Sequence, residues 1–289
     1  MPLSSPLLRL QVIEKFSIMR FTVPRRVPGT LFVRNLVERR SLLFQLVRRD
    51  FQQRFVGSAI GWIWGVIHPL VLLLSWVYIF QYCLGMKQSG GVPYPLFIFS
   101  GMLPWLLFSD TVQRSAASLL DQANLITKSV FPSEIVPVSV FLSSLVSHLL
   151  ALVLMVGAAA LELHKFSAFL LLLPVFMFLV GLFSVGLGWV MASLHVFLRD
   201  TAQFLSVVLT FWFWMTPIMI PEDKVPHKVR FVLAANPMNY AVRVYRSALL
   251  EARWPHPMDL AILAASASVT FVLGGLFFRY MKRGFADVL

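Results

Sequence analysis

Apolar residues are grouped along this chain into six stretches that are each long enough to cross a lipid bilayer. A hydrocarbon core of roughly 30 Å requires about 20 mainly apolar residues of α-helix. None of the stretches alternates apolar and polar residues as barrel strands do. Backbone groups within lipid must bond inside their own segment, so these unbroken runs predict helices. The predicted spans are approximately Val56–Leu84, Pro95–Val112, Ile135–Leu161, Phe169–Leu194, Thr201–Ile220 and Leu260–Tyr280.

The composition agrees with an all-α integral membrane protein that has one membrane domain. Apolar residues make up 58% of the 289 residues and charged residues only 13%, and no polar region is large enough to fold as a second domain. Cys83 is the only cysteine, which excludes an internal disulfide and a CxxC metal pair. Residues 1–30 contain four prolines and lack the apolar core of a secretory signal. We expect them to form a flexible cytoplasmic extension.

Lys and Arg outnumber Asp and Glu by 25 to 13, and their distribution indicates an orientation in a membrane rather than a nucleic acid partner. With six spans, the N-terminus shares a side with the C-terminal tail and with residues 113–134 and 195–200. That side carries 17 of the 25 basic residues. The positive-inside rule therefore predicts that both termini are cytoplasmic.

Two segments on the predicted cytoplasmic side have an amphipathic pattern. Residues 31–51 place apolar side chains near helical spacing, with Arg34 and Glu38 away from that stripe, as in a helix that lies in the headgroup plane. This helix either only anchors the chain or also contacts a cytoplasmic partner. Residues 122–132 end at Pro132 and connect two spans. They form either an ordinary connection or a lever that acts on both spans.

Residues 221–257 contain five prolines, and the apolar pieces between them are too short to cross a membrane. The mildly apolar part is Val229–Leu250. A re-entrant hairpin that dips in from the outer side fits this pattern, and such backbone is tolerated only where protein or water surrounds it. The alternative is a folded external loop.

The first predicted span opens with Gly57, Gly61 and Gly65, a doubled G-x-x-x-G. Glycine at every fourth position of a helix predicts a groove for close helix packing. His68 follows and precedes Pro69, where we expect a kink. An intramembrane histidine is a candidate functional residue, and the alternative is a packing or interface role.

Aromatic residues reach 14% and gather at Trp76–Tyr82, Phe97–Phe108 and Phe211–Trp214. Interfacial aromatic belts account for many of them. Flat rings with a polar edge also suit weak contacts with sugar rings. Both interpretations stay open for these clusters.

Motifs of catalysis and nucleotide binding are absent from the sequence. Lys128 and Ser129 follow no glycine loop, so there is no P-loop, and H-E-x-x-H, G-x-S-x-G and Cys/His clusters do not occur. We therefore predict a subunit without catalytic residues, cofactor or metal that takes its energy from a partner. Asp110 stands four residues before Arg114, which predicts an ion pair on one helix face.

Eight stretches, in order over about residues 31–289, resemble the transmembrane subunit of ABC-2 type polysaccharide exporters, which move lipid-linked O-antigen or teichoic acid out of bacterial cells. They are Arg54-Phe-Val-Gly-Ser-Ala-Ile-Gly-Trp-Ile-Trp64, His68-Pro69, Tyr94-Pro-Leu-Phe-Ile-Phe-Ser-Gly-Met-Leu-Pro-Trp105, Ala123-Asn-Leu-Ile-Thr-Lys128, Phe131-Pro-Ser-Glu-Ile-Val-Pro137, Val196-Phe-Leu-Arg-Asp200, Asn236-Pro237 and Phe285-Ala-Asp-Val-Leu289.

The resemblance implies a homodimeric permease of the bacterial inner membrane that works with two copies of a separate ABC ATPase on a lipid-linked glycan. It implies an interface helix at 31–51, a coupling helix at about 122–132 and re-entrant gate helices at about 221–250. The residues expected at the ATPase are Asn124, Leu125, Ile126, Lys128 and Phe131. The residues expected at the glycan path or gate are Trp105, Phe211, Trp212, Asn236, Pro237, Tyr240 and Arg246.

Other functions stay open at this stage. O-antigen is the first expectation for the substrate, and teichoic acid, capsule, or a small drug or lipid are the alternatives. An exporter of drugs or lipids should lack the aromatic-rich lining and the paired re-entrant helices. A membrane-embedded glycosyl- or acyltransferase would need a base placed at a cleft, and the sequence shows none with a partner.

Overall fold

Helices are the only regular elements among the residues that the structure, a computed structural model, describes: 40–54, 57–86, 92–128, 131–164 and 168–288. The chain divides into a unit of residues 1–38 and a unit of residues 39–289, and the described residues all belong to the second. The all-α prediction is confirmed for them. The predicted extension and the first part of the predicted interface helix lie outside the described residues.

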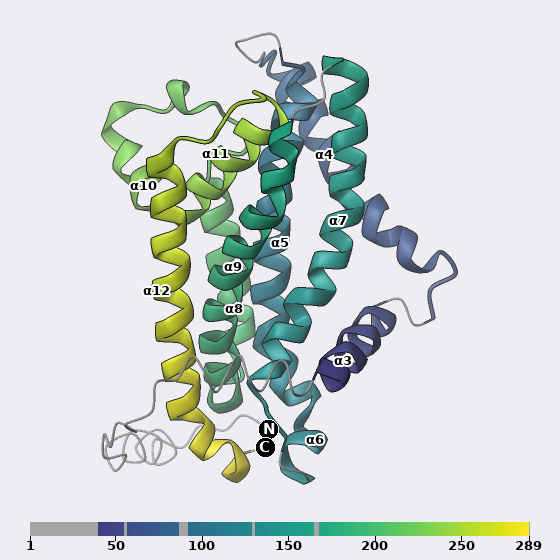
Figure 1. Ribbon diagram of the computed structural model, residues 1–289, viewed down its shortest axis with the longest axis vertical. Coiled ribbons are helices and arrows are strands. Elements are labelled where there is room, and N and C mark those ends of the chain that lie inside the picture. The colour runs from purple at the N-terminus through teal and green to yellow at the C-terminus, as the bar shows by residue number, and fades with distance from the viewer. Residues whose placement is uncertain (1–39, 55–56, 87–91, 129–130, 165–167, 289) are drawn as a thin grey trace. The chain divides into compact units, whose positions relative to one another are not determined.

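Five helical segments in the described ranges are long and apolar enough to cross a membrane, and Figure 1 shows them side by side. Five of the six predicted spans correspond to them. They are α4 (Trp64–Val77) between η1 (Gly61–Ile63) and the π-helical turn η2 (Tyr78–Cys83), α5 (Tyr94–Asp121), α7 (Ile135–Leu163), α8 (Leu173–Phe197) after η3 (Ala168–Leu172), and α12 (Pro257–Met281) before η6 (Lys282–Asp287).

The fifth predicted span is shorter in the structure than in the sequence-based prediction. It forms α9 (Thr201–Trp214), a helix of 14 residues, where the prediction extended to Ile220. Pro217 follows the end of the helix. Proline lacks a backbone N–H and disfavours helical backbone in the residue before it. The helix therefore ends at Trp214, three residues before Pro217, and the chain continues as an irregular segment.

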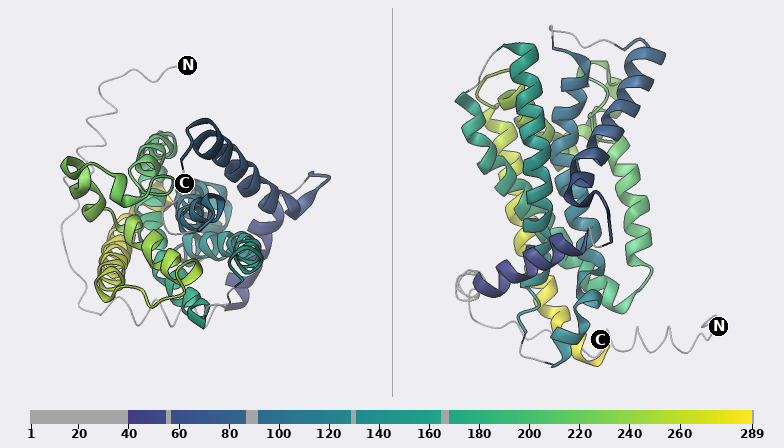
Figure 2. Two further views of the ribbon diagram at one scale, coloured as in Figure 1. Left: turned by 90° about the horizontal axis from the view of Figure 1, so that it is seen from above. Right: turned by 90° about the vertical axis from the view of Figure 1, so that its right-hand side faces the viewer.

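Helix α5 is the most deeply buried of the five long segments. It packs against α7, α8 and α11 (Pro237–Leu249), and the views in Figures 1 and 2 agree on this central position. By contrast, few residues of α4 and α12 are buried. Their apolar side chains therefore face away from the interior of the protomer, where lipid or a second protein chain would cover them.

A close helix contact joins α8 and α12 at two glycines that the sequence-based interpretation did not single out. A Cβ on Gly274 would lie 2.1 Å from the carbonyl oxygen of Gly186, and a Cβ on Gly186 would lie 2.5 Å from the carbonyl oxygen of Thr270. Only glycine at both positions lets the two backbones touch.

The prediction that Gly57, Gly61 and Gly65 form a groove on one face of a helix is wrong. Gly57 and Gly61 have φ angles of +78° and +60°, which are left-handed values that glycine adopts without strain. Gly57 lies before the helical segment, and Gly61 is its first residue, in a 3₁₀ turn. Only Gly65 lies within α4. The three glycines therefore shape the entry to the span rather than one face of a helix.

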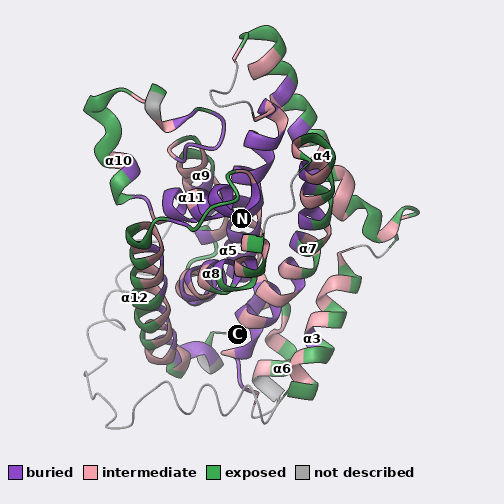
Figure 3. Cartoon of the chain, turned by 45° about the horizontal axis from the view of Figure 1, so that its top comes forward, coloured by how far each residue is buried: buried purple, intermediate pink, exposed green. Residues whose placement is uncertain are grey.

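Short helices lie at the two opposite ends of the bundle (Figures 1 and 2). At one end, α3 (Arg40–Gln53) packs against α7 and α6 (Ala123–Lys128) connects α5 to α7. At the other end lie α10 (Arg230–Ala235) and α11, after the turns η4 (Glu222–Lys224) and η5 (His227–Val229). Figure 3 shows that α11 is almost entirely buried although it is shorter than the spans.

Candidate functional site

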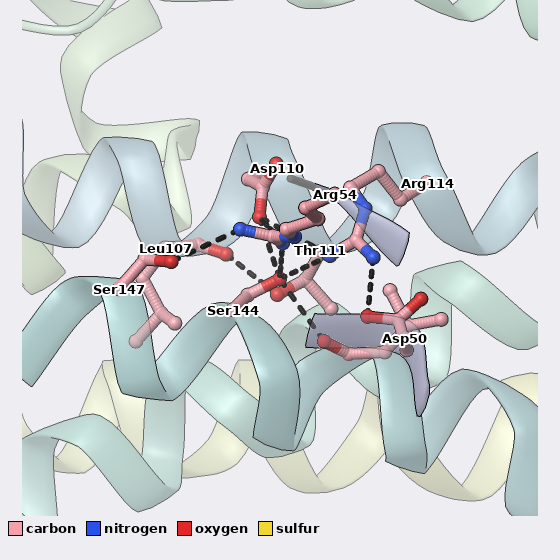
Figure 4. A network of polar contacts seen from close by, with 9 residues as sticks. Asp50, Arg54, Leu107, Asp110, Thr111, Arg114, Ser144 and Ser147 are labelled. Atoms are coloured by element: carbon pink, nitrogen blue, oxygen red, sulfur yellow. Dashed lines mark hydrogen bonds and ion pairs between the residues drawn. The ribbon is translucent and has the colours of Figure 1, made fainter. Parts of the chain in front are cut away.

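A network of four charged side chains joins α3, α5 and α7 (Figure 4). Arg54, just after α3, pairs with Asp110 of α5, and Arg114 of α5 pairs with Asp50 of α3. Arg114 Nη1 also lies 3.7 Å from Asp110 Oδ2, which confirms the predicted pair within α5. The structure adds the two partners from α3, so the pair fixes a second helix instead of only solvating a helix end.

Two serines of α7 complete this network. Arg54 donates hydrogen bonds of 3.0 Å to both Ser147 Oγ and Ser144 Oγ, and Ser144 Oγ donates to Asp110 Oδ2 at 2.6 Å. Burial raises the pKa of the Asp50 carboxyl, and the charge of Arg54 opposes this rise. Because the four side chains are only partly exposed, their hydrogen bonds are shielded from water and hold more firmly than surface pairs.

A cavity of about 510 Å³ opens beside the network. Its walls come from α4, α5, α7 and α9, and they combine an apolar surface with polar groups from the network. The His68 of α4 lies in this wall, so the structure places it next to polar groups and not at a surface far from them. The other polar lining residues are Arg54, Ser109, Asp110, Gln113, Arg114, Ser144, Ser147, His148 and Ser206.

One cavity residue contacts α11, the short helix at the opposite end of the bundle from α6. His148 Nε2 of α7 lies 3.2 Å from the hydroxyl of Tyr245 in α11, within hydrogen-bond distance, and their rings meet edge to face with centroids 5.9 Å apart. Both side chains are buried. Two polar groups buried together satisfy each other, so this contact links the cavity wall to α11.

Asn236, a residue predicted at the gate, joins α9 to the start of α11. Its Oδ1 accepts hydrogen bonds from Trp212 Nε1 at 2.8 Å and from the Met238 amide at 3.0 Å. Its Nδ2 donates to Thr216 Oγ1 at 3.0 Å. Asn236 is thus the N-cap of α11, and Pro237 occupies the first helical position, where its missing N–H costs nothing.

Arg246 of α11 is also buried, with 8% of its surface exposed. Its Nη2 donates to the carbonyl oxygen of Ile218 at 2.7 Å, and its guanidinium lies 3.7 Å from the centre of the Phe97 ring. A Cβ on Gly101 would lie 2.9 Å from Nη2, so glycine makes room for this arginine. Arg246 therefore fixes α11 to the start of α5 inside the protomer.

The aromatic residues predicted along a path separate into buried and exposed groups. Trp105 and Tyr240 are 5% and 7% exposed, whereas Phe211 of α9 is 66% exposed. Trp105 packs edge to face against Phe108, Trp212 and Phe213, and Tyr240 donates its hydroxyl to Ala234 O at 2.8 Å. The first two rings therefore belong to the interior of the protomer, and only Phe211 of these three presents its face outward.

The residues predicted to contact an ATPase lie on or beside α6, at the end of the bundle opposite α11, which carries several of the residues predicted at a gate. Asn124 and Leu125 are exposed, and Ile126 and Phe131 are half-buried. The side chain of Lys128 lies outside the described residues. Among the described residues, no group of three His, Cys, Asp or Glu side chains could hold a metal ion.

A model of the ABC-2 type transporter family matches residues 41–250, which include the network, the cavity, α6 and α11. The chain belongs to the ABC-2 type transporter family. It is 31% identical over 258 residues to an O-antigen export system permease protein of Myxococcus xanthus, covering 88% of this chain and 98% of that protein. An O-antigen export system permease protein of Klebsiella pneumoniae is 24% identical, covering 86% and 95%. A polysialic acid transport protein of Escherichia coli is 24% identical, covering 81% and 91%.

The ABC-2 chain contains three relationships that the sequence reasoning missed: the contact of Arg54 with the serines of α7, the His148–Tyr245 contact, and the Gly186–Gly274 crossing. One of them has a signal in the sequence. Ser144, Ser147 and His148 are polar residues at helical spacing within an apolar span, and such residues face protein or a water-filled cavity. Their partners could not be identified, because contacts between distant segments have no local pattern.

Proposed function

We propose that this ABC-2 family member is the transmembrane subunit of an ATP-driven exporter of a lipid-linked polysaccharide, with O-antigen as the first candidate substrate. The observation that carries the proposal is the similarity over nearly the whole length of a permease named for O-antigen export. The functional unit is a homodimer in the bacterial inner membrane, with six crossings per protomer and both termini in the cytoplasm. Two copies of a separate ABC ATPase supply the energy.

The position of α6 supports the role of a coupling helix. It connects α5 to α7, and it exposes Asn124 and Leu125 at the end of the bundle. A force on this helix therefore reaches two long helices together. The network between α3, α5 and α7 (Figure 4) joins α3 to the C-terminal half of α5, which leads into α6, so movement of α5 and α7 also moves α3.

The exposed rings of α4 and α9 support a path between two protomers. Tyr78 and Tyr82, which extend α4, are 64% and 72% exposed, and Phe204 and Trp214 of α9 are similarly exposed. Trp76 stacks on Phe213 with centroids 5.0 Å apart, so the two helices are neighbours. Aromatic contacts worth about 0.5–1.5 kcal/mol each would hold a sliding polymer weakly without trapping it.

Helices α10 and α11 support a gate at the outer end. Helix α11 is buried among α5, α8 and α12 at the end of the bundle opposite α6, which is where a re-entrant helix would lie. The side chains of Asn236, Arg246 and Tyr240 hold this gate in place rather than line it.

Capsular polysaccharide is the second candidate substrate, because the polysialic acid transport protein is similar over most of its length at 24% identity. The experiment that tests the function is deletion of the gene in its own host, followed by analysis of surface polysaccharide. We expect loss of the long-chain polymer from the surface and its accumulation on the cytoplasmic side, with restoration by the intact gene. Unchanged surface O-antigen together with lost capsule would assign the second candidate, and unchanged amounts of both would contradict the proposal.

A further inference from the structure

Helix α7 carries polar contacts toward both ends of the bundle within little more than one turn. Ser144 and Ser147 each accept a hydrogen bond of 3.0 Å from Arg54, at the end of α3. The next residue, His148, contacts the Tyr245 hydroxyl of α11 at 3.2 Å. Residues three and four positions apart lie on the same side of a helix, so these three side chains form one polar patch in an otherwise apolar span.

Each end of this chain of contacts is itself held. Arg54 is paired with Asp110 of α5. Tyr245 is fully buried, and its ring also packs against Phe176 of α8 with centroids 6.3 Å apart. Neither end can move far without breaking a polar contact that is partly buried at Arg54 and fully buried at Tyr245, and an unpartnered polar group in such an environment is costly.

We propose that His148 and Tyr245 are positioning residues that make α7 a strut between the α3 end of the bundle and α11. Helix α7 is continuous over 29 residues and follows α6 and residues 129–134. A displacement at α6 therefore shifts Ser144, Ser147 and His148 as one body, and the contact with Tyr245 passes that shift to α11. The use of this movement in export rests on the proposed function, whereas the mechanical link does not.

The test is hydrogen–deuterium exchange of the full chain in lipid nanodiscs, without any ATPase or substrate. Tyr245→Phe removes one hydroxyl and keeps the ring. We expect faster exchange in α11 and also in α3 (Arg40–Gln53), by about two- to tenfold, which is the range for loss of one neutral hydrogen bond. The matched control is Tyr240→Phe, because the partner of the Tyr240 hydroxyl among the described residues is Ala234 O, nearby in the chain. This control should change exchange in α10 and α11 alone.

The reciprocal variant is Ser147→Ala, which removes a bond to Arg54 and should speed exchange in α11, because coupling between two sites acts equally in both directions. Its control is Ser139→Ala, whose hydroxyl bonds to Val136 O within α7. Wild-type exchange of α3 in Tyr245→Phe together with wild-type exchange of α11 in Ser147→Ala would overturn the proposal. The proposal would also be overturned if Tyr240→Phe changed the exchange of α3 as much as Tyr245→Phe does, or if Ser139→Ala changed the exchange of α11 as much as Ser147→Ala does. Since no export is measured, failure here leaves the proposed function untouched, and failure of export leaves this result untouched.

Discussion

Arg54 and Asp110 are joined by an ion pair although 56 positions separate them in the chain. The pair fixes the residue after α3 to the middle of α5, and Ser144 of α7 bonds to both partners. Helix α3 is thereby held against two helices of the bundle.

Asp110→Asn should lower the free energy of unfolding by about 1–3 kcal/mol, because two partly buried guanidiniums lose a charged acceptor. Thermal unfolding in detergent micelles measures the effect. Asp200→Asn is the control, since Asp200 is exposed and makes no capping hydrogen bond through its side chain. If the loss comes from the pair, Arg54→Gln combined with Asp110→Asn should cost less than the sum of the single changes. A strictly additive result would contradict the described geometry.

Gly274→Ala should destabilise the contact of α8 with α12, because the new methyl group would lie 2.1 Å from Gly186 O. Overpacking of this kind costs typically 1–3 kcal/mol. Gly157→Ala is a matched control within α7, where a Cβ would meet nothing within 4 Å, and it should leave the melting temperature unchanged or raise it, since alanine favours helix over glycine. Equal melting temperatures for both variants would show that the two helices do not cross at these glycines.

Leu125→Asp should uncouple export from ATP hydrolysis, because a charge placed in a packed interface is costly. The protein should still insert and fold, since Leu125 is exposed in the protomer. Leu84→Asp provides the control, as Leu84 is an exposed leucine in the segment that leads into the start of α5, whereas α6 follows the end of α5. Copurification with the ATPase and surface polymer are the measurements. Wild-type values for both in a folded Leu125→Asp protein would remove α6 from the ATPase interface.

Cysteine labelling tests whether the short helix α9 completes a crossing. After replacement of Cys83 by Ser, a cysteine at Asn124 should react only from the cytoplasm and one at Lys228 only from outside. Three crossings, α7, α8 and α9, separate these positions in the six-span topology. Labelling of both positions from the same side would mean that one of the three helices does not cross.

Much of the fold could be predicted because membrane spans leave a local signal. A run such as Ile135–Leu163 is mainly apolar, and lipid leaves such a run little alternative to a helix. The N-cap at Asn236 and the helix start at Pro237 likewise follow from local chemistry. The end of α9 was missed because apolarity continues past Trp214 while Pro217 stops the helix.

The site was less predictable, since burial depends on which helices become neighbours. Trp105, Phe211 and Tyr240 are all aromatic residues of predicted spans or of the predicted re-entrant segment, yet two of them are interior and one is exposed. The glycines illustrate the same limit. Gly57 and Gly61 have the helical spacing but left-handed backbone, whereas Gly186 and Gly274 make a close backbone contact without sharing a motif.

The central claim is that this chain, with an ATPase partner, moves a lipid-linked glycan across the membrane. Inverted inner-membrane vesicles that contain both proteins and the lipid-linked polymer test it directly, because exported glycan would enter the vesicle lumen and become protected from an added glycosidase. We predict that this protection requires ATP and both subunits. Leu125→Asp should reduce the protection, and Leu84→Asp should not. Equal protection without ATP, or in vesicles that lack this chain, would contradict the account.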